Sequence, residues 1–116
     1  MRLYIGSMAV NLHPIKGNMA ENKNETICLE ADRLVNGDRQ WSYDHPYDNC
    51  KRIGQIWGII LDKDEPIPPH KVALMMAGLK IAREIHRHTR DNLVDLAGYA
   101  QVAQMVHERE NEMKDI

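Results

Sequence analysis

Three carboxylates in the C-terminal half of the sequence have the spacing of candidate metal ligands. Asp91 and Asp95 are four residues apart, which places them on one face of a helix, and Glu84 precedes them across a predicted turn. Mg²⁺ prefers carboxylate oxygens as ligands, and in nucleotide sites the substrate phosphates supply others. The pattern predicts that Asp91 and Asp95, with or without Glu84, hold one Mg²⁺ ion.

Basic side chains of the same region are candidate phosphate ligands. Lys80 and Arg83 are three residues apart on one polar stripe of a predicted helix. A guanidinium can grip a phosphate through two parallel hydrogen bonds, and a lysine contributes a compact charge. In the alternative interpretation, the turn sets Arg83 level with Asp95 and the two form an ion pair between helices. Because removing one partner of a buried pair costs about 3–5 kcal/mol, structure alone would then explain both residues.

The stretch from Gly37 to Pro46 lacks the alternation of a strand and is typical of a loop rich in hydrogen-bonding groups. Loops between rigid helices often carry ligand contacts. We expect a nucleotide or another phosphorylated small molecule to contact this loop and the helices around it. The candidate ligand-binding residues are Arg39, Tyr43, His45, Asn49, Lys80, Arg83 and Tyr99. In the structural alternative, Arg39 and Asp44 cap neighbouring helices and Trp41 covers an edge of the core.

Other patterns for chemistry are weaker. Glu84 and His88 are four residues apart and, with His86, could hold a metal, but histidines at a helical turn more often shape the turn. The sequence shows no nucleophile next to a base, no glycine-rich phosphate loop and no Cys-x-x-Cys. Any hydrolase activity would therefore have to come from Asp91, Asp95 and Glu84.

Two long helices must position these groups. Apolar residues recur at helical spacing from Pro69 to Val106 with a break at His88 and Thr89, which predicts an antiparallel pair with Thr89 as the N-cap of its second helix. The first helix carries two apolar stripes, one of Val72, Met75, Met76, Leu79 and Ala82, and one of Leu74, Ala77, Ile81 and Ile85. Such a helix is expected to be buried on both sides, with one side covered by another subunit of a homodimer or tetramer.

Upstream segments complete a single all-α domain over residues 24–110. A first helix is expected over 24–36, with Asn24 as its N-cap and Gly37 as its stop. The next begins at Pro46 and is expected to bury Tyr47, Cys50, Ile53, Ile56, Trp57, Ile60 and Leu61. Residues 62–69 form a solvated, proline-rich connector. Residues 1–23 are expected to be an extension or an arm exchanged between subunits, and residues 111–116 a frayed helix end.

Composition limits the class of function. The 116 residues are 43% hydrophobic and 28% charged, which is typical of one globular domain. The net charge of −2 argues against binding duplex nucleic acid. No stretch approaches the length of a membrane span, and no secretory signal is evident. Cys28 and Cys50 are expected to be free, buried thiols in a reducing compartment.

Four strings of this sequence resemble a small domain of phages and prophages whose function is unknown. They are Val72-Ala-Leu-Met-Met-x-x-Leu-Lys-Ile-Ala-Arg, Arg90-Asp-x-x-x-Asp-x-Ala-Gly-Tyr-Ala, Gly37-Asp-Arg-Gln-x-x-Tyr and Ile53-x-x-Ile-Trp. The resemblance covers roughly residues 25 to 107. The chain is also distantly similar to the MazG-type nucleoside triphosphate pyrophosphohydrolases, which are four-helix units that pair and hold magnesium between helices. The resemblance implies an all-α, four-helix, MazG-like unit that is oligomeric, with a location in the cytoplasm of the host bacterium.

MazG-type enzymes bind magnesium through an ExxE and an ExxD pair. In this sequence, Lys80 and Arg83 occupy the positions expected for the first acidic pair, and Asn92 and Asp95 occupy those of the second. The resemblance implies a phage protein that binds a nucleoside phosphate and hydrolyses its α,β-phosphoanhydride. The phosphates would be held by Arg39, Lys80 and Arg83, while Asp91, Asp95 and Glu84 would position Mg²⁺ and an attacking water. The alternatives are a non-catalytic phage protein that sequesters a nucleotide or binds a host protein, and a purely structural oligomer.

Overall fold

The computed structural model describes residues 24–38 and 45–114, and this part of the chain is helical without a strand. Four α-helices follow one another: α2 (Ile27–Arg33), α4 (Pro46–Ile60), α5 (Pro69–His86) and α6 (Arg90–Lys114). A short π-helical segment, η1 (Leu34–Asp38), continues α2. The expected all-α class is thus confirmed. None of these helices combines the length and apolar character needed to cross a bilayer.

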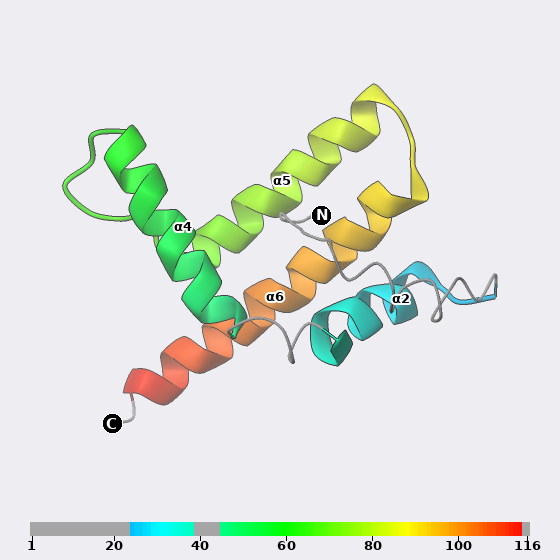
Figure 1. Ribbon diagram of the computed structural model, residues 1–116, viewed down its shortest axis with the longest axis horizontal. Helices are drawn as coiled ribbons and strands as arrows, with labels where there is room; N and C mark the ends of the chain where they lie inside the picture. Colours follow the sequence, from blue (N-terminus) through cyan, green and yellow to red (C-terminus); the bar gives the residue numbers. More distant parts are fainter. Residues whose placement is uncertain (1–23, 39–44, 115–116) are drawn as a thin grey trace.

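Helices α5 and α6 form the predicted antiparallel pair and make the most extensive contact in the fold (Figure 1). Proline starts α5 at Pro69, where its missing N–H and fixed φ suit a first helical position. The chain reverses between His86 and Arg90, and the Thr89 hydroxyl accepts a hydrogen bond of 3.2 Å from the Asn92 N–H. The expected N-cap is therefore confirmed. The second helix continues to Lys114, beyond the expected domain boundary at residue 110.

Helix α4 crosses the other two near the start of α5 (Figure 1), and it packs through glycines. Gly54 and Gly58 are buried, and the connector runs back along them, with the Ile67 N–H donating to the Gly54 carbonyl at 3.0 Å. A Cβ on Gly54 would lie 2.1 Å from the Ile67 carbonyl oxygen. The connector is thus partly packed rather than wholly solvated.

This packing corrects the predicted buried face of α4. Tyr47, Ile53 and Trp57 pack against the core as expected, and Cys50 belongs to it. Three residues expected to be buried are exposed instead: Ile56, Ile60 and Leu61. The prediction was wrong because apolar side chains were assumed to mark the contact, whereas close backbone approach at the two glycines decides which side faces the protein.

Helix α2 packs on α6, on the side of α6 away from α5 (Figure 1). Its N-cap is Thr26, whose hydroxyl accepts from the Leu29 N–H at 3.1 Å, so the expected cap at Asn24 was wrong. The helical path is interrupted at Gly37, the expected stop. Cys28 is exposed, contrary to expectation, whereas Ala31 and Val35 are buried.

The core is built mainly from small and β-branched side chains where α4, α5 and α6 meet. Its buried members are Val35, Cys50, Val72, Ala73, Val102 and Val106. The two apolar stripes predicted for α5 are largely unburied within this chain, since five of its large side chains are exposed: Leu74, Met75, Leu79, Ile81 and Ile85. The sides of α5 that are covered are the one that faces α6, where Lys80 is buried, and the start of the helix, where Val72 lies beside Gly54 of α4.

Candidate functional site

The charged centre of the candidate site is an ion pair between Lys80 of α5 and Asp95 of α6. Lys80 Nζ lies 2.9 Å from Asp95 Oδ2, and the two side chains are only 8% and 12% exposed. The predicted pairing of Arg83 with Asp95 was wrong, and Arg83 is exposed. Counting residues outward from the turn on both helices located the partner of Asp95 only to within one helical turn. The partner is Lys80, one turn before Arg83, because the Lys80 position faces α6 and is buried there.

The Glu84 carboxylate accepts hydrogen bonds from residues of the turn between α5 and α6 and from the first turn of α6. Its Oε1 accepts hydrogen bonds from the Thr89 N–H at 3.2 Å and the Asn92 side-chain amide at 3.3 Å, and its Oε2 lies 2.6 Å from His88 Nδ1. The hydrogen bond with His88 is the main cause that lowers the pKa of Glu84, against a smaller opposing effect of burial. The carboxylate thus satisfies a free backbone donor at the start of α6.

The third candidate carboxylate, Asp91, is exposed in the first turn of α6. Within the part of the chain that the structure describes, no three His, Cys, Asp or Glu side chains gather closely enough to hold a metal ion. Any magnesium ion at Asp91 or Asp95 would have to take most of its ligands from phosphate groups and water.

The remaining candidate residues are dispersed. Arg39 and Tyr43 lie outside the described residues. His45 is the N-cap of α4, where its Nδ1 accepts from the Tyr47 N–H at 3.0 Å. Asn49 is exposed on α4, and Tyr99 packs against the core from α6. The structure therefore brings together Lys80 with Asp95, rather than the whole predicted set.

Burial is the largest cause that lowers the pKa of His45, because it disfavours the imidazolium, and the charge of Arg109 adds to it. Asp48 and Glu112 oppose the shift. Only a neutral imidazole has a free Nδ1 lone pair, so the lowered pKa and the capping role agree.

The sequence reasoning missed two polar features. The first is Asn92, which is only 8% exposed and donates from its side chain to both Glu84 and the Arg87 carbonyl at 3.2 Å. It was considered only as the replacement for an acidic metal ligand. Its position three residues after Thr89, in the first turn of a helix, is the local signal for such a role.

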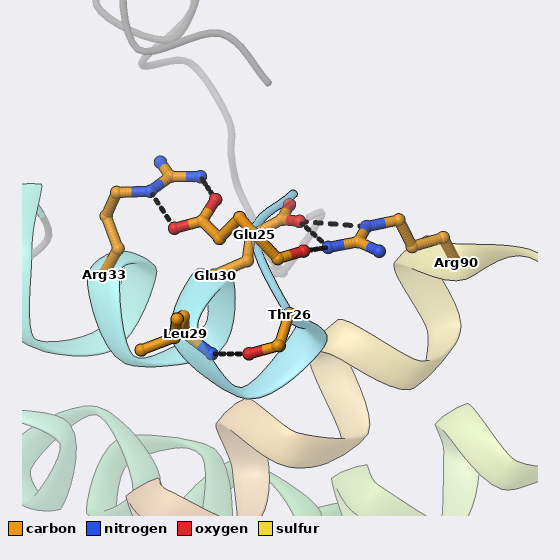
Figure 2. A network of polar contacts seen from close by, with 6 residues as sticks. All are labelled: Glu25, Thr26, Leu29, Glu30, Arg33 and Arg90. Atoms are coloured by element: carbon orange, nitrogen blue, oxygen red, sulfur yellow. Dashed lines mark hydrogen bonds and ion pairs between the residues drawn. The ribbon is translucent and has the colours of Figure 1, made fainter. Parts of the chain in front are cut away.

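The second missed feature is a network that joins α2 to the start of α6 (Figure 2). The Glu25 carboxylate forms a two-pronged pair with Arg33 at 3.0 and 3.2 Å, which lowers the pKa of Glu25. Arg90 donates to the Glu25 carbonyl at 2.7 Å and to the Glu30 carboxylate at 3.1 Å. Because Arg90 lies 60 residues or more beyond these partners, no local pattern reveals the network.

Comparison with known proteins gives a family but no activity. The family model described as "Domain of unknown function (DUF6378)" matches residues 26–107. The "Gene 55 protein" of Mycobacterium phage D29 is 37% identical over 86 residues, which are 73% of this chain and 56% of that protein. The "Gene 55 protein" of Mycobacterium phage L5 is 35% identical over 88 residues, 75% of this chain and 56% of that protein. This chain thus spans little more than half the length of these relatives. No solved structure matches it.

Proposed function

The chain belongs to this phage protein family of unknown function, and we propose that it acts as a non-catalytic helical binding module. The observation that carries the proposal is the Lys80–Asp95 ion pair. A buried carboxylate whose charge is already balanced by an ammonium group 2.9 Å away is a poor ligand for a divalent cation. The same contact occupies the lysine that a phosphate would need.

The other carboxylates support the same conclusion. Glu84 is engaged by three donors at the turn, and release of that carboxylate to position a water would leave the Thr89 N–H without its partner. That leaves Asp91 as the exposed member of the predicted catalytic set. One exposed carboxylate does not form the multi-oxygen cage that magnesium-dependent hydrolysis needs.

Binding is supported instead by the surface of α5. Five large aliphatic or thioether side chains on this helix are between 45% and 81% exposed. Large contiguous apolar surfaces mark interaction sites in soluble proteins. The function we propose is therefore protein binding through α5, in the cytoplasm of the bacterium in which a phage protein is made.

A nucleotide is the second candidate ligand, and the exposure of Arg83 favours it. This guanidinium lies one turn before the end of α5, Arg87 directly follows that helix, and both side chains are open to solvent. A bound nucleoside phosphate would contact them, together with a magnesium ion shared by Asp91 and the phosphates. In this version the protein sequesters the nucleotide, or hydrolyses it in the manner of the MazG-type enzymes.

Thermal unfolding with a panel of mono-, di- and triphosphate nucleotides separates these candidates, because a ligand that prefers the native state must raise its stability. Each nucleotide is tested with and without Mg²⁺, and pyrophosphate release is followed in parallel. The binding-module proposal predicts no turnover. Pyrophosphate release that disappears in the Asp91→Asn variant would overturn it and establish a hydrolase.

A further inference from the structure

The strongest unexplained feature of the molecule is the apolar stripe of α5 that faces away from α6. Leu74, Gly78, Ile81 and Ile85 recur at spacings of four, three and four residues, so they lie along one side of the helix. All four are exposed, and Ile85 is 81% exposed. We call these four residues, with the neighbouring Met75, Leu79 and Ala82, the α5 stripe.

We infer that the α5 stripe binds the α5 stripe of a second copy of this chain, in an antiparallel, two-fold symmetric contact centred on Gly78. This inference rests on the proposed function, because it names the partner of the binding module. The shape of the stripe, the charges at its two ends and its area all favour this contact.

The shape of the stripe complements itself when the helix is reversed. A Cβ placed on Gly78 meets nothing within 4 Å, so this exposed glycine leaves an open notch in the middle of the stripe. A two-fold axis beside Gly78 sets Leu74 opposite Ala82 of the partner subunit, and Met75 opposite Ile81 of the partner subunit. The large Leu74 then faces the small Ala82 of the other copy on either side of the notch, while Met75 and Ile81 meet as two large side chains beside the open space at Gly78. The same pairs recur across the axis, as an isologous contact requires.

The charges at the two ends of α5 select the antiparallel direction. The connector that leads into α5 has three exposed carboxylates and one lysine, contributed by Asp62, Asp64, Glu65 and Lys63. The last turn of α5 exposes Arg83 and His86, and Arg87 directly after the helix is exposed as well. The carboxylate of this turn, Glu84, is only 26% exposed and lies against His88. Reversed helices bring the acidic end of one copy toward the basic end of the other, whereas parallel helices would bring like charges together.

The area of the stripe is sufficient for a modest homodimer. At roughly 100 Å² of apolar surface for each fully exposed large aliphatic side chain, its five large residues present about 300 Å². A standard interface buries about 800 Å² per partner, of which about 65% is apolar in homodimers. The stripe alone supplies more than half of that apolar share, and the charged ends and the stem of Lys71 enlarge the contact. We therefore expect a dimer that dissociates on dilution.

Sedimentation of the full chain, from about 1 µM to about 1 mM, measures this dimer directly. We expect the wild type to shift from monomer to dimer within this range, and the Leu74→Glu variant to stay monomeric. Leu29→Glu is the matched control, because Leu29 and Leu74 are both leucines that are 59% exposed, and Leu29 lies on α2. A wild type that stays monomeric throughout overturns the inference and assigns the stripe to another protein, as does a dimer that both leucine variants retain.

Crosslinking tests the geometry independently of whether the glutamate variant folds well. In a Cys28→Ser background, Gly78→Cys should form a disulfide between two chains, because Cα atoms near a two-fold axis can approach to within about 7 Å. Gln101→Cys, at an exposed position on α6, should not. Equal crosslinking of both variants would overturn the arrangement about Gly78. Pyrophosphate release by a chain that does dimerise would instead overturn the non-catalytic role and leave the dimer standing.

Discussion

Lys80 and Asp95 meet between α5 and α6 at 2.9 Å, and each side chain is about nine-tenths buried. The two charges come from helices that are separated in sequence by the turn at residues 87–89, and their contact lies on the side of α5 that packs against α6. In such a pair each charge makes the burial of the other tolerable, so the two residues are expected to act as one unit.

A double-mutant cycle tests this unit. Asp95→Leu and Lys80→Met should each lower the free energy of unfolding by about 3–5 kcal/mol, because each leaves one buried charge without its partner. The double variant Lys80→Met with Asp95→Leu should recover most of that loss, since apolar side chains of similar volume fill the same space. Urea unfolding monitored by circular dichroism provides the measurement. Additive losses in the double variant would show that the two residues are not coupled.

Gly54 should tolerate no side chain. The Cβ added by Gly54→Ala would lie 2.1 Å from the Ile67 carbonyl oxygen, so the connector must move, and we expect a loss of about 3 kcal/mol or more. Gly78→Ala is the matched control within a helix, because its Cβ meets nothing within 4 Å and alanine favours the helix by about 1 kcal/mol. Both changes are measured in the Leu74→Glu background, so that dimerisation does not contribute. Equal effects of the two substitutions would contradict the close approach of the connector to α4.

The N-cap of α4 should make stability depend on pH near neutrality. Burial lowers the pKa of His45 below its ordinary value of 6.5, so the folded state prefers the neutral imidazole. This contribution is fully present above pH 6.5 and is lost as the pH falls through 6.5 toward the lowered pKa of the folded state. His45→Asn keeps a capping acceptor without titrating in this range. Chemical unfolding at a series of pH values should therefore show a smaller decrease for the variant, and identical decreases would rule out the role of His45.

Glu84 should control stability in acid. Its pKa is lowered from 4.5, mainly by the hydrogen bond with His88, so its stabilising effect is present above pH 4.5 and is lost as the pH falls through the lowered pKa. Glu84→Ala should reduce the melting temperature at neutral pH, because the Thr89 N–H and the Asn92 amide lose their acceptor. The difference in melting temperature between variant and wild type should shrink in acid. A difference that persists at the lowest pH would point to packing rather than charge as the role of Glu84.

The sequence by itself determined the local features of this protein. Pro46 and Pro69 start α4 and α5, Thr89 caps α6, and the turn lies where the apolar periodicity breaks. These features were predictable because proline geometry, capping hydroxyls and helical periodicity act within a few residues. The family resemblance added membership in a phage protein family of unknown function, which the comparisons confirm, but no settled chemistry.

Only the tertiary structure decided which faces of the helices meet and which charges pair. Ile56 and Ile60 are as apolar as any core residue, yet Gly54 is the residue that faces the connector, because backbone proximity outweighs side-chain hydrophobicity at a close crossing. Lys80 rather than Arg83 reaches Asp95, since the rotation and level of two packed helices depend on all their contacts at once. If α5 slid along α6 by one helical turn, the capping residues and apolar periodicity of each helix would be unchanged, but a different basic residue would be buried opposite Asp95. The partners of the charged residues therefore had to be found in the folded chain.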